Sequence, residues 1–271
     1  MSKIETGQVS ASAAEIYEEL YLPALFLEWT PRMADAARIG AGQRVLDVAC
    51  GTGVLARTVA DRVGPRGTVV GFDINEGMLA VARRKAPAVE WRQGAAEDLP
   101  FPDASFDAVV SQFGLMFFQD RARAIRQMIR VLRPGDRLAV AVWDSLDRTP
   151  AYAVFVSMLE RLFGKVTAEA LRSPFVLGDT QALLPLFRDA GVPDAHIATH
   201  EGSAHFPSIE SWVFTDVKGW TAADLIDEAG YKRLLAEAER ELQPFVLADG
   251  TVAFALPAHI VTATKPAGRT S

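Results

Sequence analysis

One stretch of the sequence decides the fold: VLDVACGTGVLA, residues 45–56. Its apolar, β-branched beginning predicts a buried strand, and Gly51 and Gly53 predict a tight turn that opens a helix. Glycines in such a turn let the backbone approach a ligand closely, and the first helical turn offers N–H groups that no helix carbonyl accepts. The stretch therefore predicts a ligand-binding turn between a strand and a helix.

A second apolar run, residues 68–72, is followed directly by Asp73. A carboxylate at such a strand end can accept both hydroxyls of a ribose, which indicates a nucleoside cofactor. The glycines with Ala56 and Asp73 also fit a nicotinamide dinucleotide fingerprint. Asp47 favours another ligand, because an acid before the glycine turn repels a pyrophosphate but suits an ammonium and a sulfonium. We therefore expect S-adenosylmethionine, with a nicotinamide-dependent reductase as the alternative.

Short apolar runs alternate with stretches of helical periodicity between residues 44 and 143, which predicts βαβ units and a parallel sheet. The helix from Asp120 to Leu132 has the clearest signal, because Asp120 can cap it and its apolar side chains recur at helical spacing. The five strands are expected at Arg44–Val48, Thr68–Phe72, Val89–Gln93, Phe106–Ser111 and Arg137–Trp143.

Helices and two further strands are expected around this core. An amphipathic stripe before the sheet predicts a helix pair interrupted at Pro23. The later elements are expected at Tyr152–Leu162, Gln181–Ala190 and Ser208–Leu242 for helices, and at Ala195–Ser203 and Thr251–Thr264 for strands. We expect a single domain, 1–271, made of an N-terminal helical flap (1–40), a cofactor-binding core (41–143), lid helices with the sixth strand (144–250) and a final strand (251–264).

Composition excludes several classes of protein. The chain has 271 residues, 49% of them hydrophobic, enough for a large core and too apolar for a disordered chain. Its net charge of −6 disfavours a nucleic-acid partner. No apolar run is long enough to cross a membrane, residues 1–10 lack a signal core, and Cys50 is the single cysteine. We expect a cytoplasmic protein without membrane insertion, and the sequence is compatible with a homodimer.

Four segments carry a family resemblance. Residues 45–53, 70–78, 94–108 and 130–142, including DLPFPDASFD at 98–107, resemble successive motifs of the class I S-adenosylmethionine-dependent methyltransferases. The nearest likeness is to the ubiquinone and menaquinone biosynthesis methyltransferases. The resemblance implies a three-layer, Rossmann-like α/β fold whose seven-stranded sheet has the order 3-2-1-4-5-7-6, with the last strand antiparallel and helical lid insertions.

The resemblance also assigns cofactor-binding residues. It places the glycine turn and Asp47 at the methionine part of S-adenosylmethionine, Asp73 at the ribose, and Gln112 beside the methionine part and the reacting methyl group. The adenine would lie between side chains after the second and third strands. The full expected set is Asp47, Gly51, Gly53, Asp73, Ile74, Met78, Ala96, Glu97 and Gln112.

The acceptor is expected to be a small, fairly apolar molecule. The fourth strand ends in SQFG, residues 111–114, and not in the Asn or Asp followed by Pro-Pro and an aromatic residue of amino-directed nucleic-acid methylases. Aromatic residues gather in segments that the fold brings over the carboxyl edge of the sheet, where ligands bind. The candidates for the acceptor pocket are Tyr17, Tyr21, Phe113, Phe117, Trp143, Phe175 and Trp212.

Methyl transfer from a sulfonium is an in-line displacement that mainly requires alignment and exclusion of water. We expect O- or C-methylation, with N- or S-methylation or a catalytically silent S-adenosylmethionine-binding regulator as alternatives. The histidines show no metal-ligand spacing, so no metal is expected. No catalytic residue is assigned, but His205, just before the break at Pro207, is a candidate proton acceptor.

Overall fold

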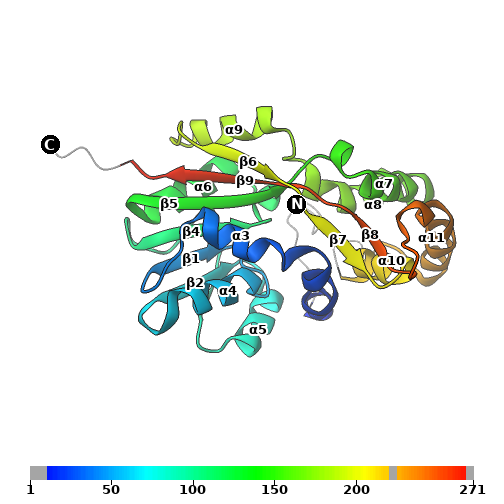
Figure 1. Ribbon diagram of the computed structural model, residues 1–271, viewed down its shortest axis with the longest axis horizontal. Helices are drawn as coiled ribbons and strands as arrows, with labels where there is room; N and C mark the ends of the chain where they lie inside the picture. Colours follow the sequence, from blue (N-terminus) through cyan, green and yellow to red (C-terminus); the bar gives the residue numbers. More distant parts are fainter. Residues whose placement is uncertain (1–10, 220–224, 267–271) are drawn as a thin grey trace.

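A seven-stranded sheet, in the order β3-β2-β1-β4-β5-β9-β6, forms the centre of the computed structural model (Figure 1). The structure describes residues 11–219 and 225–266. Strand β9 runs antiparallel to both of its neighbours, and the other strands are parallel to one another. This confirms the expected order and the antiparallel last strand. The strands are β1 Arg44–Val48, β2 Thr68–Asp73, β3 Glu90–Gln93, β4 Phe106–Gln112, β5 Leu132–Trp143, β6 His196–His200 and β9 Ala258–Thr264.

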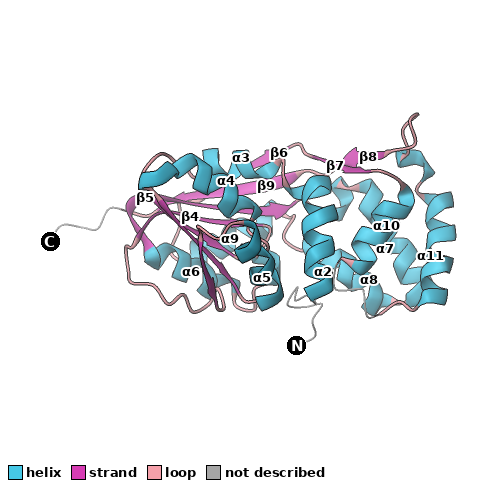
Figure 2. Cartoon of the chain, turned by 90° about the horizontal axis from the view of Figure 1, so that it is seen from below, coloured by secondary structure: helices cyan, strands magenta, loops and turns pink. Residues whose placement is uncertain are grey.

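Helices cover both faces of this sheet. Helix α3 (Trp29–Ala36) packs against α4 (Val54–Val63), and α6 (Arg121–Val131) packs against α9 (Thr180–Asp189). Figure 2 shows α3 and α4 on one side of the strands and α6 on the other. Helix α5 (Glu76–Lys85) follows β2. The expected cap of α6 is present, since the Asp120 carboxylate accepts a hydrogen bond from the Arg123 amide at 2.8 Å.

Each of the two late strands expected from the sequence is divided. The segment expected at Ala195–Ser203 forms β6 and then β7 (Ser203–Phe206), and the segment expected at Thr251–Thr264 forms β8 (Val252–Ala255) and then β9. Strands β7 and β8 pair with each other in a separate two-stranded sheet.

The division falls at Gly202. The Leu256 amide donates to the Gly202 carbonyl at 2.8 Å, and a Cβ at Gly202 would lie 2.2 Å from the Trp29 ring. The β7–β8 pair, called the ribbon below, therefore follows directly on the β6–β9 pair. The two pairs are separated at Gly202, where the backbone packs against the Trp29 ring.

The remaining helices gather beyond the carboxyl ends of the parallel strands (Figures 1 and 2). They are α7 (Pro150–Phe163), α8 (Lys165–Arg172), α10 (Ile209–Lys218) and α11 (Glu228–Glu241). Helices α7, α10 and α11 share a core with the β7–β8 ribbon, and the fully buried Trp212 lies within it. In the described part of the chain, 11–219 and 225–266, no helix combines the length and the apolar character needed to span a bilayer.

The N-terminal segment consists of α2 (Ala11–Ile16), the π-helix Tyr17–Phe26 (η1) and α3. The expected interruption at Pro23 is wrong, because the helix continues through this residue. Its wider π turns accommodate a proline ring that would clash with a carbonyl in an α-helix, and the Leu27 amide donates to the Leu22 carbonyl, five residues earlier. Residues 1–10 of the expected flap lie outside the described residues.

Candidate functional site

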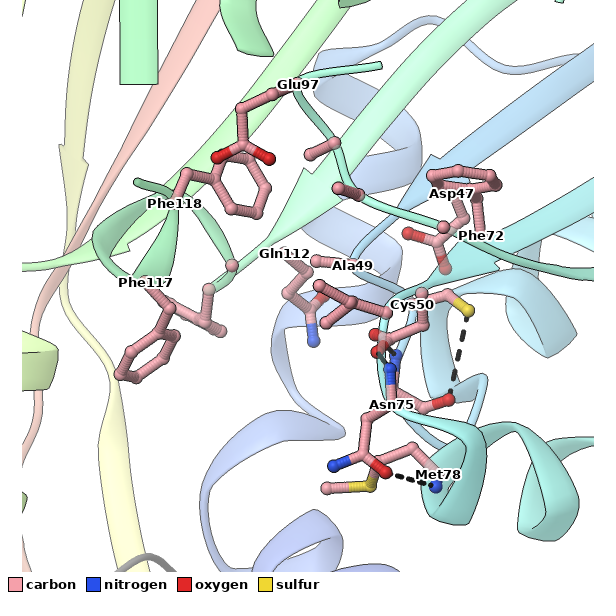
Figure 3. Close-up of a pocket in the computed structure, with 18 of the residues that line it drawn as sticks. Asp47, Ala49, Cys50, Phe72, Asn75, Met78, Glu97, Gln112, Phe117 and Phe118 are labelled. Carbon is pink, nitrogen blue, oxygen red and sulfur yellow. Dashed lines mark hydrogen bonds between the residues drawn. The ribbon is translucent and has the colours of Figure 1, made fainter. Parts of the chain in front are cut away.

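A cavity of about 380 Å³ opens at the carboxyl ends of β1, β2 and β4. It is bordered by the glycine turn, by the segments after β2, β3 and β4, and by Tyr17 of the N-terminal segment. Figure 3 shows Phe117 and Phe118 on one side and Asp47, Cys50 and Phe72 on the other. The expected ligand-contacting residues found in its wall are Asp47, Gly51, Asp73, Ile74, Met78, Ala96, Glu97 and Gln112.

Asp73 holds the glycine turn in place. One carboxylate oxygen accepts a hydrogen bond from the Gly51 amide and the other from the Asn75 amide, both at 2.8 Å. Gly51 and Ala49 both have left-handed backbone, with φ of 54° and 57°. Such a conformation is rare for alanine and is typically retained at functional sites. Burial raises the pKa of Asp73, and the hydrogen bonds from backbone amides oppose this rise.

The Asp47 carboxylate is buried and unpaired among the described residues. Its side chain is 1% exposed, and neither carboxylate oxygen has a hydrogen-bond partner among the described residues. Burial raises the pKa of this carboxyl well above its ordinary value, the nearby charge of Asp73 adds to the rise, and the backbone amide of Ala56 opposes it only in part. A buried, unpaired carboxylate is costly, so this position suits a ligand that brings a positive charge.

Gly53 is not among the residues that line the cavity, and its contact with a ligand stays a prediction. It begins α4 with φ of 85°, and a Cβ on it would lie 2.2 Å from the indole ring of Trp91. Glycine is therefore required here by the backbone conformation and by packing against Trp91.

Replacing Gly53 with alanine should cost at least about 2 kcal/mol more unfolding free energy than the same change at Gly135. Gly135 has nearly the same backbone, with φ of 87°, but a Cβ there would meet nothing within 4 Å. Both variants strain a left-handed residue, and only the first also displaces Trp91. Urea unfolding of the two variants measures the difference, and equal losses would contradict the packing explanation.

Two further residues of the wall also bind neighbouring segments. One Glu97 carboxylate oxygen accepts hydrogen bonds from the amides of Gln119 and Asp120, at 2.8 and 3.3 Å, which joins the loop after β3 to the start of α6. Gln112 donates to the Phe26 carbonyl at 3.3 Å, and its buried side-chain oxygen has no partner among the described residues. Gln112 thus presents a hydrogen-bond acceptor between the sheet and the N-terminal segment.

A second, smaller cavity of about 60 Å³ adjoins the first. Tyr17, Phe113 and Phe117 line both cavities and form the boundary between them. Phe113 stacks on Trp143 with ring centroids 3.7 Å apart, and its own backbone is left-handed, with φ of 56°. Six expected acceptor-pocket residues line this cavity: Tyr17, Tyr21, Phe113, Phe117, Trp143 and Phe175.

Two of the sequence candidates lie elsewhere. Trp212 is fully buried among aromatic rings and lines neither cavity. His205 lies on β7 with an exposed side chain, paired with the Ser203 hydroxyl at 2.9 Å, and it too lines neither cavity. Its exposed position on a ribbon strand gives no support to a role as proton acceptor in the site.

Asp216 is the residue that sequence reasoning missed. It lines the second cavity at 2% exposure. Its carboxylate accepts hydrogen bonds from the Tyr21 hydroxyl and the Trp212 indole N–H, both at 2.6 Å, and from the Tyr152 hydroxyl at 3.5 Å. Burial raises its pKa to about 7. An acid four residues after Trp212 on an otherwise apolar helix face was the available signal.

The raised pKa of Asp216 predicts a particular dependence of stability on pH. The folded protein holds this proton up to about pH 7 and the unfolded chain only to about pH 4, so stability falls as pH rises between these values. Relative to the Asp216→Asn variant, the wild-type protein should lose a few kcal/mol across this interval. Urea unfolding at several pH values measures the difference, and parallel curves for the two proteins would contradict the prediction.

Comparisons with known proteins agree with the motifs. A model of the methyltransferase domain family matches residues 45–135. The chain is 34% identical over 196 residues to a demethylmenaquinone methyltransferase of Listeria welshimeri, covering 66% of this chain and 83% of that protein. It is 35% identical over 184 residues to a ubiquinone/menaquinone biosynthesis C-methyltransferase of Hahella chejuensis, covering 65% and 74%.

Solved structures show the same fold. A Bacillus halodurans protein described as a putative methyltransferase superposes with a TM-score of 0.59 at 22% identity, covering 88% of this chain and 98% of that one. A Haemonchus contortus phosphoethanolamine N-methyltransferase in complex with S-adenosyl-L-methionine superposes with a TM-score of 0.61 at 18% identity, covering 95% and 57%.

Proposed function

This chain belongs to the class I S-adenosylmethionine-dependent methyltransferases, and on that premise we propose that it methylates a small, largely apolar acceptor at oxygen or ring carbon. The observation that carries the proposal is the second cavity, whose wall is mainly aromatic and which meets the larger cavity at Tyr17, Phe113 and Phe117. One cavity suits the methyl donor and the other suits an acceptor beside it.

The larger cavity fits the donor's chemistry. S-adenosylmethionine supplies an electrophilic methyl group on a sulfonium and carries an ammonium, a carboxylate and a ribose. The orphaned carboxylate of Asp47 would pair with the ammonium, and the second lone pairs of Asp73 would accept from the ribose hydroxyls. Side chains that would flank or read the adenine are Ile74, Met78, Ala96 and Glu97.

The chain's own residues would align the reactants and exclude water. The rings of Phe113 and Trp143 form a rigid stack in the wall of the second cavity, and Phe117 borders both cavities. Displacement at a sulfonium gains most from such positioning, because its geometry is strictly in line. The apolar wall also keeps water from the methyl group.

Acceptor binding requires the N-terminal segment to move. The second cavity holds about 60 Å³, less than the ~150 Å³ of an engineered cavity that admits benzene. Four of its lining residues, Tyr17, Tyr21, Leu25 and Phe26, belong to the π-helix η1. This helix is held to α4 by the ion pair of Glu18 with Arg57 at 2.9 Å. A shift of η1 would therefore enlarge the cavity.

A calorimetric and turnover series tests the proposal. The purified protein is titrated with S-adenosylmethionine, its demethylated product and NADH, and is then incubated with methyl-labelled donor and a panel of phenols, quinols, amines, thiols and RNA. We expect binding of the first two ligands only and labelled methyl groups on the oxygen or ring carbon of phenols or quinols. Labelling confined to amines, thiols or RNA would overturn the assignment of the acceptor.

A further inference from the structure

The second cavity contains a charge that its size and apolar wall do not require. Among the described residues that line it, Asp216 alone carries a charge, and the rest are aromatic or aliphatic side chains. No ion pair links Asp216 to a cation of residues 11–219 or 225–266. A buried carboxylate without a cation is expensive, and apolar residues of similar volume commonly replace buried charges at no loss of stability.

Three helices supply hydrogen-bond donors to the Asp216 carboxylate. The Tyr21 hydroxyl comes from η1, the Tyr152 hydroxyl from α7 and the Trp212 indole from the same helix as Asp216. The two hydrogen bonds at 2.6 Å occupy one lone pair on each carboxylate oxygen. The Tyr152 hydroxyl, at 3.5 Å, lies on the same oxygen as the Tyr21 hydroxyl. The other oxygen, which accepts from Trp212, has a second lone pair, so Asp216 retains capacity to accept a hydrogen bond from a molecule in the cavity.

We propose that Asp216 binds the acceptor's hydroxyl group and takes its proton during methyl transfer, an inference that rests on the proposed function. The acceptor's O–H bond breaks and its proton passes to the carboxylate. The acceptor oxygen then forms a bond to the methyl carbon while the carbon–sulfur bond breaks, leaving the demethylated donor. Attack through a ring carbon instead forms a carbon–carbon bond and gives a ketone. The ring regains its aromaticity when Asp216 returns its proton to the oxygen and the ring C–H proton passes to water.

The electrostatics of the cluster suit this task. A phenol has a pKa near 10, so it ionises little at neutral pH without a base. Burial raises the pKa of Asp216 to about 7, close to the value at which a general base works best near neutrality. The groups that face the carboxylate are Tyr21, Tyr152 and Trp212, and burial raises the pKa of both tyrosines further from neutrality. A pH dependence near 7 would therefore belong to Asp216.

The Asp216→Asn variant tests the inference. We expect kcat with an ordinary phenol or quinol to fall about 100-fold or more, while the affinity for the demethylated donor stays within twofold. A dinitrophenol, which is ionised well below neutral pH, should restore most of kcat because it needs no base. The matched control is Asp194→Asn, which removes an exposed carboxylate outside both cavities and should leave kcat unchanged.

A second measurement needs no variant, in case the asparagine protein does not fold. In the wild-type protein, kcat/KM for an ordinary phenol should rise across pH 7, and for the dinitrophenol, which is ionised throughout this range, the rise should be absent. Retention of kcat and of the pH profile by Asp216→Asn, or equal pH profiles for both phenols, would overturn the role of Asp216. Failure of the wild-type protein to methylate any hydroxylated ring while binding the donor would instead refute the proposed function, and the role of Asp216 with it.

Discussion

Replacing Asp47 with asparagine is expected to stabilise the ligand-free protein and at the same time to weaken binding of S-adenosylmethionine about 100-fold, equivalent to about 2.7 kcal/mol. The carboxylate is buried with no hydrogen-bond donor among the described residues, so it is costly until a cation arrives. Because its pKa is raised, the protein loses stability as pH rises through that pKa. The stabilisation in the variant, about 1–3 kcal/mol, should therefore appear at higher pH and vanish near pH 4.

Urea unfolding without ligand and calorimetric titration with S-adenosylmethionine measure the two effects. Asp61→Asn is the matched control, because Asp61 is an exposed acid on α4 outside the cavity and its loss should change neither quantity. Unchanged affinity in Asp47→Asn would refute the pairing of this carboxylate with the ammonium.

Replacing Asp73 with alanine should weaken donor binding at least as much, but with the opposite effect on stability. This carboxylate accepts hydrogen bonds from the amides of Gly51 and Asn75, and its removal leaves both without that partner and frees the glycine turn. We expect the free energy of unfolding to fall by about 2 kcal/mol and affinity to fall 100-fold or more.

Urea unfolding and calorimetric titration together distinguish the roles of Asp47 and Asp73. Asp47 lies one residue before the end of β1 and Asp73 ends the neighbouring β2, and both border one cavity. In the part of the chain that the structure describes, only Asp73 of the two carboxylates accepts hydrogen bonds. A stabilised Asp73→Ala protein, or one that binds the donor normally, would refute the assignment of Asp73 to the turn and the ribose.

The cofactor half of the molecule could be predicted because its signals are local. A glycine turn after an apolar strand, and an acid at the end of the next strand, lie within short stretches of sequence. Parallel strands end at one edge of a sheet, which places Asp47, Gly51 and Asp73 close to one another. The packing role of Gly53 could not be predicted, because it depends on contact with Trp91, a residue of another strand that spacing alone does not reveal.

The acceptor half depends on contacts between distant segments. Asp216 meets Tyr21 across 195 residues of sequence, and the position of Trp212 inside the helical core followed from packing that no periodicity encodes. The position of His205 before Pro207 makes it a candidate from sequence. Because the late strands divide at Gly202, however, His205 lies on β7 and lines neither cavity. Such tertiary effects override local patterns.

A crystal structure of the protein with the demethylated donor, S-adenosylhomocysteine, would test the assignment of the two cavities. We expect the ribose hydroxyls on Asp73, the ammonium within hydrogen-bond distance of Asp47, and the sulfur facing the boundary formed by Tyr17, Phe113 and Phe117. A ligand bound outside the larger cavity, or one whose sulfur points away from the aromatic second cavity, would contradict it.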